Sequence, residues 1–322
     1  MSFAWVIGSG GLLGAALCRA LRRDGTGLFV PPQRFAWDDE EALALNFSAA
    51  VSAFGMLARN AGSWEIYWAA GLGSMGTQDA ALERETRILA LLLQLIETQA
   101  SLGAVPGTLV FASSAGAIYA GSRDWIVTES SEVAPTTAYA HTKLRQEQMV
   151  RAFAQSGERR AALLARLSTL YGPGQSAGKQ QGLIGHIARC SIRNQPIQIY
   201  VPFDTIRDYI TADDAAVAMV RAARCVGGGG AEVRMKIIAS ERPTTIAEII
   251  SIFKRLVRRA PRVVTSAGRL TGLYPRRVQF RSATDPCGPR PAGTSLLVGI
   301  AQVVAAERMM LARGSHAAPA RQ

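Results

Sequence analysis

Near its amino terminus the chain carries the stretch Trp5-Val6-Ile7-Gly8-Ser9-Gly10-Gly11-Leu12-Leu13-Gly14. An apolar strand signal runs into a glycine-rich turn and then into an apolar helical pattern. This order is typical of the first unit of a dinucleotide-binding Rossmann fold, in which the pyrophosphate rests on the helix N-terminus. Gly8 permits the tight turn, Gly11 lets the backbone approach the phosphates, and Gly14 lets the helix pack closely on the strand. The alternative for this segment alone is an ordinary glycine-rich turn.

The rest of the chain alternates between strand and helix signals. Short apolar runs bounded by turns occur at Ala4–Ile7, Leu28–Val30, Glu65–Trp68, Thr108–Ala112, Ala162–Arg166 and Met235–Ala239. Helical patterns lie between them at residues 12–23, 78–101, 138–156 and 212–225. This alternation predicts an α/β fold with a doubly wound parallel sheet and right-handed crossovers.

Two later parts of the chain break the alternation. We expect residues 1–171, completed by about 205–239, to form the dinucleotide-binding domain. Residues 172–204 and 240–312 are then expected to form a smaller C-terminal substrate-binding lid domain. Gly227–Gly230 is expected to link the helix 212–225 to the strand signal at Met235–Ala239. The small, polar and basic residues 313–322 predict a flexible tail.

A second motif, Tyr139-Ala-His-Thr-Lys143, lies downstream of the pair Ser113-Ser114. On a helix, positions i and i+4 share a face, so the Lys143 ammonium is expected beside the Tyr139 phenol. A nearby cation favours the phenolate and moves the phenol pKa down from about 10 toward neutral pH, where it takes a proton from an alcohol. The alternatives are a chance helical pair and, for the serines, a plain turn at the end of a strand.

The composition is that of a globular protein, with 322 residues of which 48% are hydrophobic and 19% charged. Its cysteines and histidines lack the spacing of metal ligands, so reduced thiols and no metal are expected at Cys18, Cys190, Cys225, Cys287, His141, His186 and His316. The longest apolar run, 89–96, is too short to span a bilayer. With no signal peptide before Trp5, the expected location is the cytoplasm, without membrane attachment.

The formal net charge is +12. Much of the excess lies in dispersed arginine pairs, such as 22–23, 159–160, 258–259 and 276–277, and not in one block with interleaved aromatic residues. Solvated surface charge is therefore the first interpretation, attraction of phosphorylated substrates the second, and nucleic-acid binding the third.

Five motifs together resemble one known family. They are Gly8-x-x-Gly11-x-x-Gly14, Ser113-Ser114-Ala-Gly-Ala-Ile-Tyr119, Tyr139-x-x-x-Lys143, Arg166 with Tyr171-Gly-Pro-Gly174, and Arg207-Asp-Tyr-Ile210 with Asp213-Asp214. In this order, over residues 3–312, the chain is similar to the extended short-chain dehydrogenase/reductases, in particular the NAD-dependent epimerase/dehydratase group acting on nucleotide sugars.

The resemblance implies a role for each matched residue. Tyr139 is the catalytic acid/base, Lys143 lowers its pKa and holds the nicotinamide ribose, and Ser114, 25 residues before Tyr139 as in similar epimerases, bonds the reacting oxygen. The implied cofactor contacts are Gly8, Gly11, Leu12, Leu13, Gly14, Arg34, Asp38, Ala69, Ala70, Gly71, Tyr139 and Lys143. The implied substrate contacts are Ser114, Thr169, Tyr200, Arg207 and Arg281.

Some of these substrate contacts have alternatives. In the family, the arginine at the position of Arg207 binds the diphosphate, which suits a bidentate guanidinium. Thr169 stands where many relatives have an asparagine. Tyr200 is expected either to stack on the nucleotide base or to be a core aromatic, and Arg281 to make a second phosphate contact or to be a surface residue.

Two departures from the family pattern narrow the chemistry. The stretch Ala115-Gly116-Ala117 lacks the acidic residue that dehydratases and decarboxylases of the group use, which favours 4-epimerisation or reduction of a keto-sugar. The end of the second strand, near Pro31-Pro32, lacks the acid that holds the ribose of NAD. Arg34 is suited to a 2′-phosphate, so NAD and NADP both stay open, with an exposed loop arginine as the alternative.

The segment 35–39 is similar to the compressed third strand of sugar-nucleotide reductases, with Asp38 near the adenine. The sequence therefore predicts an NAD(P)-dependent epimerase acting on a nucleotide-diphosphate sugar through a keto intermediate, and as the alternative an NADPH-dependent keto-sugar reductase. A catalytically silent cofactor sensor and a nucleic-acid binder rank lower. Relatives dimerise through helices at the positions of 78–101 and 138–156, so a homodimer is expected, with a monomer as the alternative.

Overall fold

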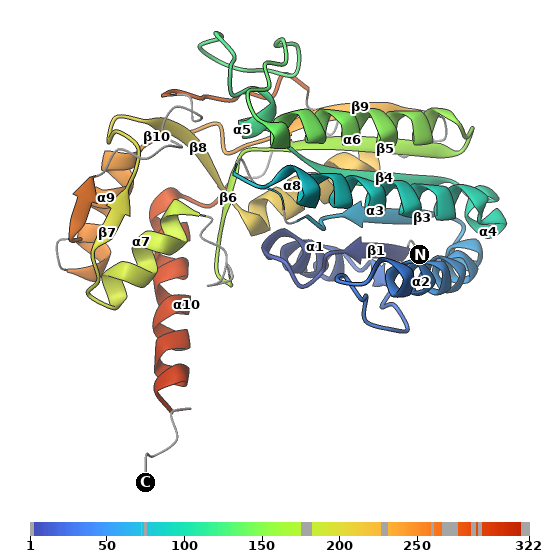
Figure 1. Ribbon diagram of the computed structural model, residues 1–322, viewed down its shortest axis with the longest axis horizontal. Helices are drawn as coiled ribbons and strands as arrows, with labels where there is room; N and C mark the ends of the chain where they lie inside the picture. The colour runs from blue at the N-terminus through green and yellow to red at the C-terminus, as the bar shows by residue number, and fades with distance from the viewer. Residues whose placement is uncertain are drawn as a thin grey trace.

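A central parallel sheet organises the computed structural model (Figure 1), which describes residues 3–71, 73, 76–174, 182–226, 231–258, 261–265, 276–284, 288 and 292–316. Its strands follow the spatial order β2-β1-β3-β4-β5-β9, and every pairing is parallel. The strands are β1 (Phe3–Ile7), β2 (Gly27–Leu28), β3 (Trp64–Trp68), β4 (Gly107–Ser114), β5 (Arg160–Leu167) and β9 (Val233–Ile238). The predicted α/β fold with a parallel sheet is thus confirmed.

Helices cover both faces of this sheet. Alternate side chains of a strand point to opposite faces, so Trp5 and Ile7 of β1 enter one core while Ala4 and Val6 enter the other. The first core includes α2 (Glu40–Ala61), α3 (Asp79–Thr98), the short α4 (Ala100–Gly103) and α6 (Ala138–Gln155). The second includes α1 (Leu12–Arg23) and α8 (Ala212–Val226).

A smaller unit stands beside the carboxyl-terminal side of the sheet (Figure 1). It has its own apolar core, to which Tyr171, Ile187, Phe253 and Ile300 contribute. Its elements are β6 (Thr169–Tyr171), α7 (Leu183–Ile192), β7 (Ile197–Ile199), β8 (Ile206–Thr211), β10 (Pro243–Thr245), α9 (Ile246–Val257), β11 (Val263–Thr265) and α10 (Leu296–His316). Strands β10, β8 and β6 form one small sheet, and β11 pairs with β7. The exact domain boundaries stay a prediction.

Several local expectations are corrected by the structure. Residues 35–39 form no strand; they are an irregular segment that ends at Asp39, whose side chain caps α2 by accepting from the backbone N–H groups of Glu41 and Ala42. Helix α2 itself was not predicted, although its buried Phe47 and Phe54 repeat at helical spacing. Helix α10 continues to His316, so the first part of the predicted tail is helical, while 317–322 lie outside the described residues.

The cysteines also differ from expectation. Cys225 is disulfide-bonded, so the prediction of reduced thiols is wrong for this residue. Cys18 and Cys190 are free. Cys287 and the predicted linker Gly227–Gly230 lie outside the described residues.

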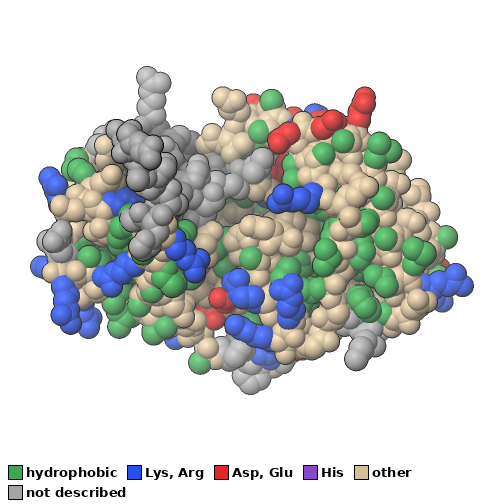
Figure 2. Space-filling model, turned by 90° about the horizontal axis from the view of Figure 1, so that it is seen from below, with side chains coloured by type: hydrophobic (Ala, Val, Ile, Leu, Met, Phe, Trp, Pro, Cys, Tyr) green, Lys and Arg blue, Asp and Glu red, His purple; other side chains and the backbone are tan. Residues whose placement is uncertain are grey.

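One described helix, α2, is long and apolar enough to meet the length and composition criteria for crossing a membrane. Its buried residues pack on the sheet, as expected for a core helix. On the face shown in Figure 2, Lys and Arg side chains stand in separate groups among hydrophobic and other residues.

The turn between β1 and α1 generates a prediction about stability. A Cβ atom on Gly14 would lie 2.0 Å from the carbonyl oxygen of Gly8, which is backbone and has little freedom to move. We expect Gly14→Ala to lower the free energy of unfolding by about 1–3 kcal/mol through overpacking, measured by urea denaturation. The matched control is Gly10→Ala, because a Cβ there meets nothing within 4 Å. Equal stability of the two variants would contradict this account of the turn.

Candidate active site

The glycine-rich turn lies against the end of β3. Gly8 has a φ of +88°, and a Cβ there would lie 2.6 Å from the backbone nitrogen of Ala70. Only glycine therefore allows the turn to approach the segment Ala69–Gly71 so closely. Gly11 is the N-cap of α1 and has no side chain to satisfy the first N–H groups of the helix. These donors suit a phosphate group, so the segment fits a dinucleotide. Leu13 is buried beneath it, and Leu12 starts the helix.

A cavity of about 1100 Å³ opens beside this turn. Its lining includes Gly8–Gly10 and the segment Leu28–Trp37, together with Arg19 and Arg22 of α1. Arg34 is also among the lining residues, and its contact with a 2′-phosphate stays a prediction. The described lining residues contain arginines and no carboxylate, a charge balance that suits a phosphate. Asp38 is exposed and directly follows Trp37, the last lining residue.

Tyr139 and Lys143 lie on the first turns of α6, which Thr137 caps through the backbone N–H of Ala140. The Lys143 Nζ stands 5.7 Å from the centre of the Tyr139 ring and 5.1 Å from that of Phe111 on β4. The helical spacing thus brings the ammonium and the phenol together, as the sequence predicts.

The pKa of Tyr139 nevertheless moves in the direction opposite to the one expected. Burial is the largest influence and raises the pKa, and the negative charge of Glu85 raises it further. Lys143 and a hydrogen bond from Ser114 lower it, but they do not outweigh burial. In this structure the phenol is therefore neutral at physiological pH, and the expectation that Lys143 moves the pKa of Tyr139 down toward neutral pH is wrong.

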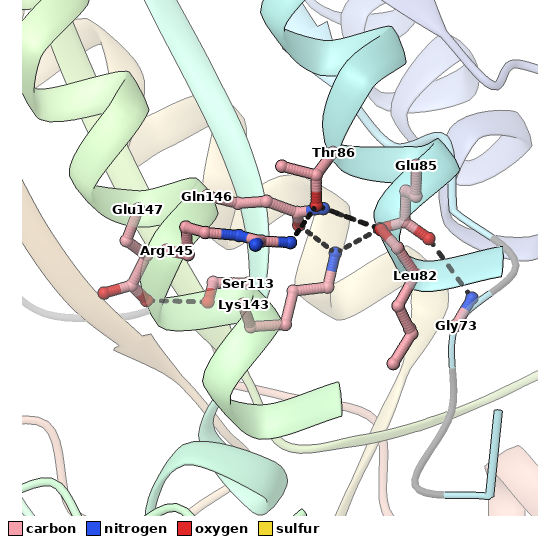
Figure 3. A network of polar contacts seen from close by, with 9 residues as sticks. All are labelled: Gly73, Leu82, Glu85, Thr86, Ser113, Lys143, Arg145, Gln146 and Glu147. Carbon is pink, nitrogen blue, oxygen red and sulfur yellow. Dashed lines mark hydrogen bonds and ion pairs between the residues drawn. The ribbon is translucent and has the colours of Figure 1, made fainter. Parts of the chain in front are cut away.

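Glu85 is the partner of Lys143 that sequence reasoning missed (Figure 3). Its Oε1 lies 2.8 Å from the Lys143 Nζ, and the two side chains are only 8% and 6% exposed. Gln146 Oε1 accepts a second hydrogen bond from Lys143 at 3.0 Å. A signal existed, because Glu85 is a charged residue on the buried face of α3, one turn from Leu82 and Leu89.

The two serines take different positions because consecutive strand residues face opposite ways. Ser113 is buried and donates to Glu147 Oε1 at 2.6 Å. Ser114 caps α5 (Ala115–Ile118) and lies close enough to Tyr139 to lower its pKa by a hydrogen bond. Its catalytic role stays a prediction.

Behind the site, Glu147 and Arg166 form a buried ion pair. Arg166 donates from Nε and Nη2 to the two Glu147 oxygens at 2.9 and 2.7 Å, and from Nη1 to Tyr119 Oη. This bidentate pair links α6, β5 and α5, and together with Ser113 it ties them to β4. It holds the backbone that carries Ser114 and Tyr139.

The other predicted substrate contacts lie on the smaller unit and on the segment 276–284. Thr169 on β6 and Arg207 on β8 lie on neighbouring strands, because Thr169 is paired with Tyr209, two residues after Arg207. Arg207 donates to its neighbour's carbonyl, that of Ile206, at 2.9 Å. Tyr200 is 49% exposed, so its alternative as a core aromatic is wrong.

Arg281 lies on the segment 276–284, whose residue Val278 donates its backbone N–H to the carbonyl of Ile206 on β8. It is exposed, and its backbone N–H donates to the carbonyl of Val127 at 3.0 Å. The roles of all four residues in substrate binding stay predictions.

This fold and this turn define the class of dinucleotide-dependent enzymes built on a parallel sheet. More specifically, the chain belongs to the NAD dependent epimerase/dehydratase family, whose profile matches residues 4–234. The family resemblance is thereby confirmed, and so is the cofactor class, NAD or NADP.

Two curated relatives match part of the chain. A dTDP-L-rhamnose 4-epimerase of Burkholderia thailandensis is 33% identical over 93 residues, which are 29% of this chain and 25% of the relative. A dTDP-4-dehydro-6-deoxyglucose reductase of Escherichia coli is 30% identical over 112 residues, or 35% of each protein. The matches thus span well under half the length of either relative.

Solved structures share the whole fold at low identity. MoeE5 in complex with UDP-glucose and NAD has a TM-score of 0.78 and 22% identity, over 97% of this chain and 100% of that one. RMD from Pseudomonas aeruginosa, complexed with NADPH, has a TM-score of 0.76 and 19% identity, over 96% of this chain and 100% of that one. At such identity the likeness establishes the fold alone.

The buried pair behind the site generates a second prediction. Glu147→Gln removes one partner and leaves the Arg166 guanidinium without a counter-charge, so we expect a loss of about 3–5 kcal/mol in the free energy of unfolding. Glu83→Gln is the control: Glu83 and Arg145 form a 2.7 Å pair whose side chains are 53% and 45% exposed, and its loss should cost less than about 1 kcal/mol. Urea denaturation of both variants checks this, and a similar cost for the two would refute it.

Proposed function

We propose that the protein is an NAD(P)-dependent epimerase acting on a nucleotide-diphosphate sugar through a transient keto intermediate. The observation that carries the proposal is the meeting of Ser114, Tyr139 and Lys143, with Ser114 at the carboxyl end of β4. The chain after β3 approaches Gly8 at Ala69 and Ala70, and it approaches the Tyr139 ring at Gly73. The relatives named as an epimerase and a reductase of dTDP-sugars support this substrate class.

The proposed chemistry assigns each side chain a task. Tyr139 takes the proton from the sugar hydroxyl and returns it, Ser114 bonds the same oxygen, and Lys143 stabilises the negative charge that develops on the phenol. Bound NAD or NADP supplies the hydride acceptor and donor and, when oxidised, a positive charge that favours the phenolate. Arg207 would bind the diphosphate, so that binding energy away from the reacting carbon positions the sugar.

A reductase is the second candidate, and the arginine-lined cavity favours it, because guanidinium groups suit the 2′-phosphate of NADPH. We also propose that the protein forms a homodimer, which packs through the helix pair α3 and α6. Its proposed location is the cytoplasm.

Two measurements separate the candidates. Mass spectrometry of the purified protein is expected to find retained NAD or NADH for an epimerase, which regenerates its cofactor in place. Incubation with a panel of UDP- and dTDP-sugars is expected to give a C4 epimer, whereas a reductase would oxidise NADPH in the presence of a keto-sugar. Cofactor binding without turnover of any such substrate would favour the silent sensor, and nucleic-acid affinity that survives moderate salt would favour the nucleic-acid binder.

The proposed acid/base makes a mutational prediction. Tyr139→Phe should lower turnover by roughly 10²–10⁴-fold, because the phenol oxygen is the group that moves the proton. Cofactor affinity should stay nearly unchanged, which fluorescence titration with NADH or NADPH measures.

The adjacent serines supply a matched control for this test. Ser114→Ala should lower turnover, whereas Ser113→Ala should change stability while largely sparing turnover, since its hydroxyl is bound to Glu147. Full activity of Tyr139→Phe would contradict the proposed role of Tyr139 as the acid/base.

Cofactor choice is tested at Arg34. We infer that its guanidinium binds the 2′-phosphate of NADP, so Arg34→Ala should weaken NADPH binding by roughly 10–100-fold with little effect on NADH. Arg23→Ala, an exposed arginine at the end of α1, is the control. Equal losses for NADH and NADPH would contradict a 2′-phosphate contact.

A further inference from the structure

The buried ion pair between Lys143 and Glu85 joins the candidate catalytic lysine to a carboxylate that no motif assigns (Figure 3). The Nζ–Oε1 distance is 2.8 Å, and Gln146 accepts a second bond from the same ammonium at 3.0 Å. These bonds use two of the three ammonium donors and fix where the charge sits. Lys143 is therefore held in place before any ligand binds.

The same carboxylate also holds the loop that follows β3. Glu85 Oε2 accepts from the backbone N–H of Gly73 at 3.2 Å. Gly73 packs on the Tyr139 ring so closely that a Cβ there would lie 2.9 Å from the ring atoms. A Cβ on Gly71 would lie 3.3 Å from the Glu85 carboxylate. Glu85 thus contacts the lysine, and through Gly73 it fixes the backbone that covers the tyrosine.

The charges that act on this pair come from a few elements. Lys143 and Glu147 lie on α6, Glu85 on α3, and the Ser114 hydroxyl approaches Tyr139 from β4. The charge of Glu147 is balanced by its bidentate pair with Arg166 of β5. Glu85 is consequently the carboxylate whose charge opposes the effect of Lys143 on the phenol.

We propose that Glu85 is a positioning residue that holds the Lys143 ammonium beside Tyr139 and sets the pH at which Tyr139 exchanges its proton. This rests on the proposed role of Tyr139 as the acid/base. A carboxylate at hydrogen-bond distance cancels much of the field of the ammonium at the phenol. Burial, which is the largest influence, and this carboxylate together keep the phenol protonated until a bound ligand adds positive charge or a hydrogen bond to it.

The test follows the ionisation of Tyr139 directly, by ultraviolet absorbance of tyrosinate during a pH titration. The difference between the wild-type protein and Tyr139→Phe isolates this one phenol. Removing a negative charge lowers the pKa of a neighbouring acid, so Glu85→Gln should move the midpoint to lower pH by about one unit. Glu83→Gln removes a carboxylate from the exposed side of the same helix and should leave the midpoint in place.

A second readout uses turnover in the direction that oxidises the sugar alcohol. The acid limb of the kcat/KM profile should move to lower pH in Glu85→Gln by the same amount as the titration midpoint. A merely structural role would lower the amount of folded protein without moving either midpoint. Unchanged midpoints in folded Glu85→Gln would overturn the inference. A shifted titration midpoint without turnover of any sugar would overturn the proposed function, but the inference about Glu85 would stand.

Glu85→Gln leaves a buried ammonium without its counter-charge, which threatens folding. If it does not fold, the titration is run on Lys143→Met and on the double variant Lys143→Met/Glu85→Gln, in which no member of the pair is charged. The double variant should ionise Tyr139 at lower pH than Lys143→Met, by about one unit. Equal midpoints in these two proteins would likewise overturn the inference.

Discussion

The close approach of backbone to backbone at Gly8 is the constraint on which the site depends. Because no side chain separates them, the turn after β1 lies directly against Ala69–Gly71 at the end of β3. The same loop continues to Gly73, which covers the Tyr139 ring and is held by Glu85. The backbone contact at Gly8 therefore sets the spacing between the glycine-rich turn and Tyr139, the proposed acid/base.

Charge is placed in this core in compensated pairs. Lys143 with Glu85, and Arg166 with Glu147, are both buried and joined by short hydrogen bonds. A lone buried charge would be costly, whereas a bonded pair is tolerated and fixes geometry. The pair of Arg166 with Glu147 positions the backbone behind the site. The pair of Lys143 with Glu85 lies beside the Tyr139 phenol and, by our inference, decides how easily that phenol gives up its proton.

The neutral state of Tyr139 bears on the direction of the chemistry. By our proposal, the phenol keeps its proton in an empty site and ionises when a positively charged ligand binds, so it acts as a base only in the loaded site. In the proposed chemistry the same group serves as a proton donor in reduction and, once ionised, as the base in oxidation. An epimerase uses both steps in each turnover, and a reductase uses one, so one arrangement of Tyr139, Lys143 and Glu85 is compatible with either enzyme.

Features that depend on neighbours along the chain could be read from the residues: the strand, turn and helix of residues 5–14, the alternation of strands and helices, and the shared face of Tyr139 and Lys143. Side chains on one face recur every two residues in a strand and about every 3.6 residues in a helix, so the local sequence encodes these features. It could also have indicated α2, since Asp39 and the spacing of Phe47 and Phe54 carry that signal. Three features came from the packing of distant segments: residues 35–39 form no strand, Ser113 faces Glu147, and Glu85 meets Lys143 from another helix. The direction of the Tyr139 pKa belongs to this group, because burial and the charge of Glu85 come from segments distant in the chain, and no local pattern records either.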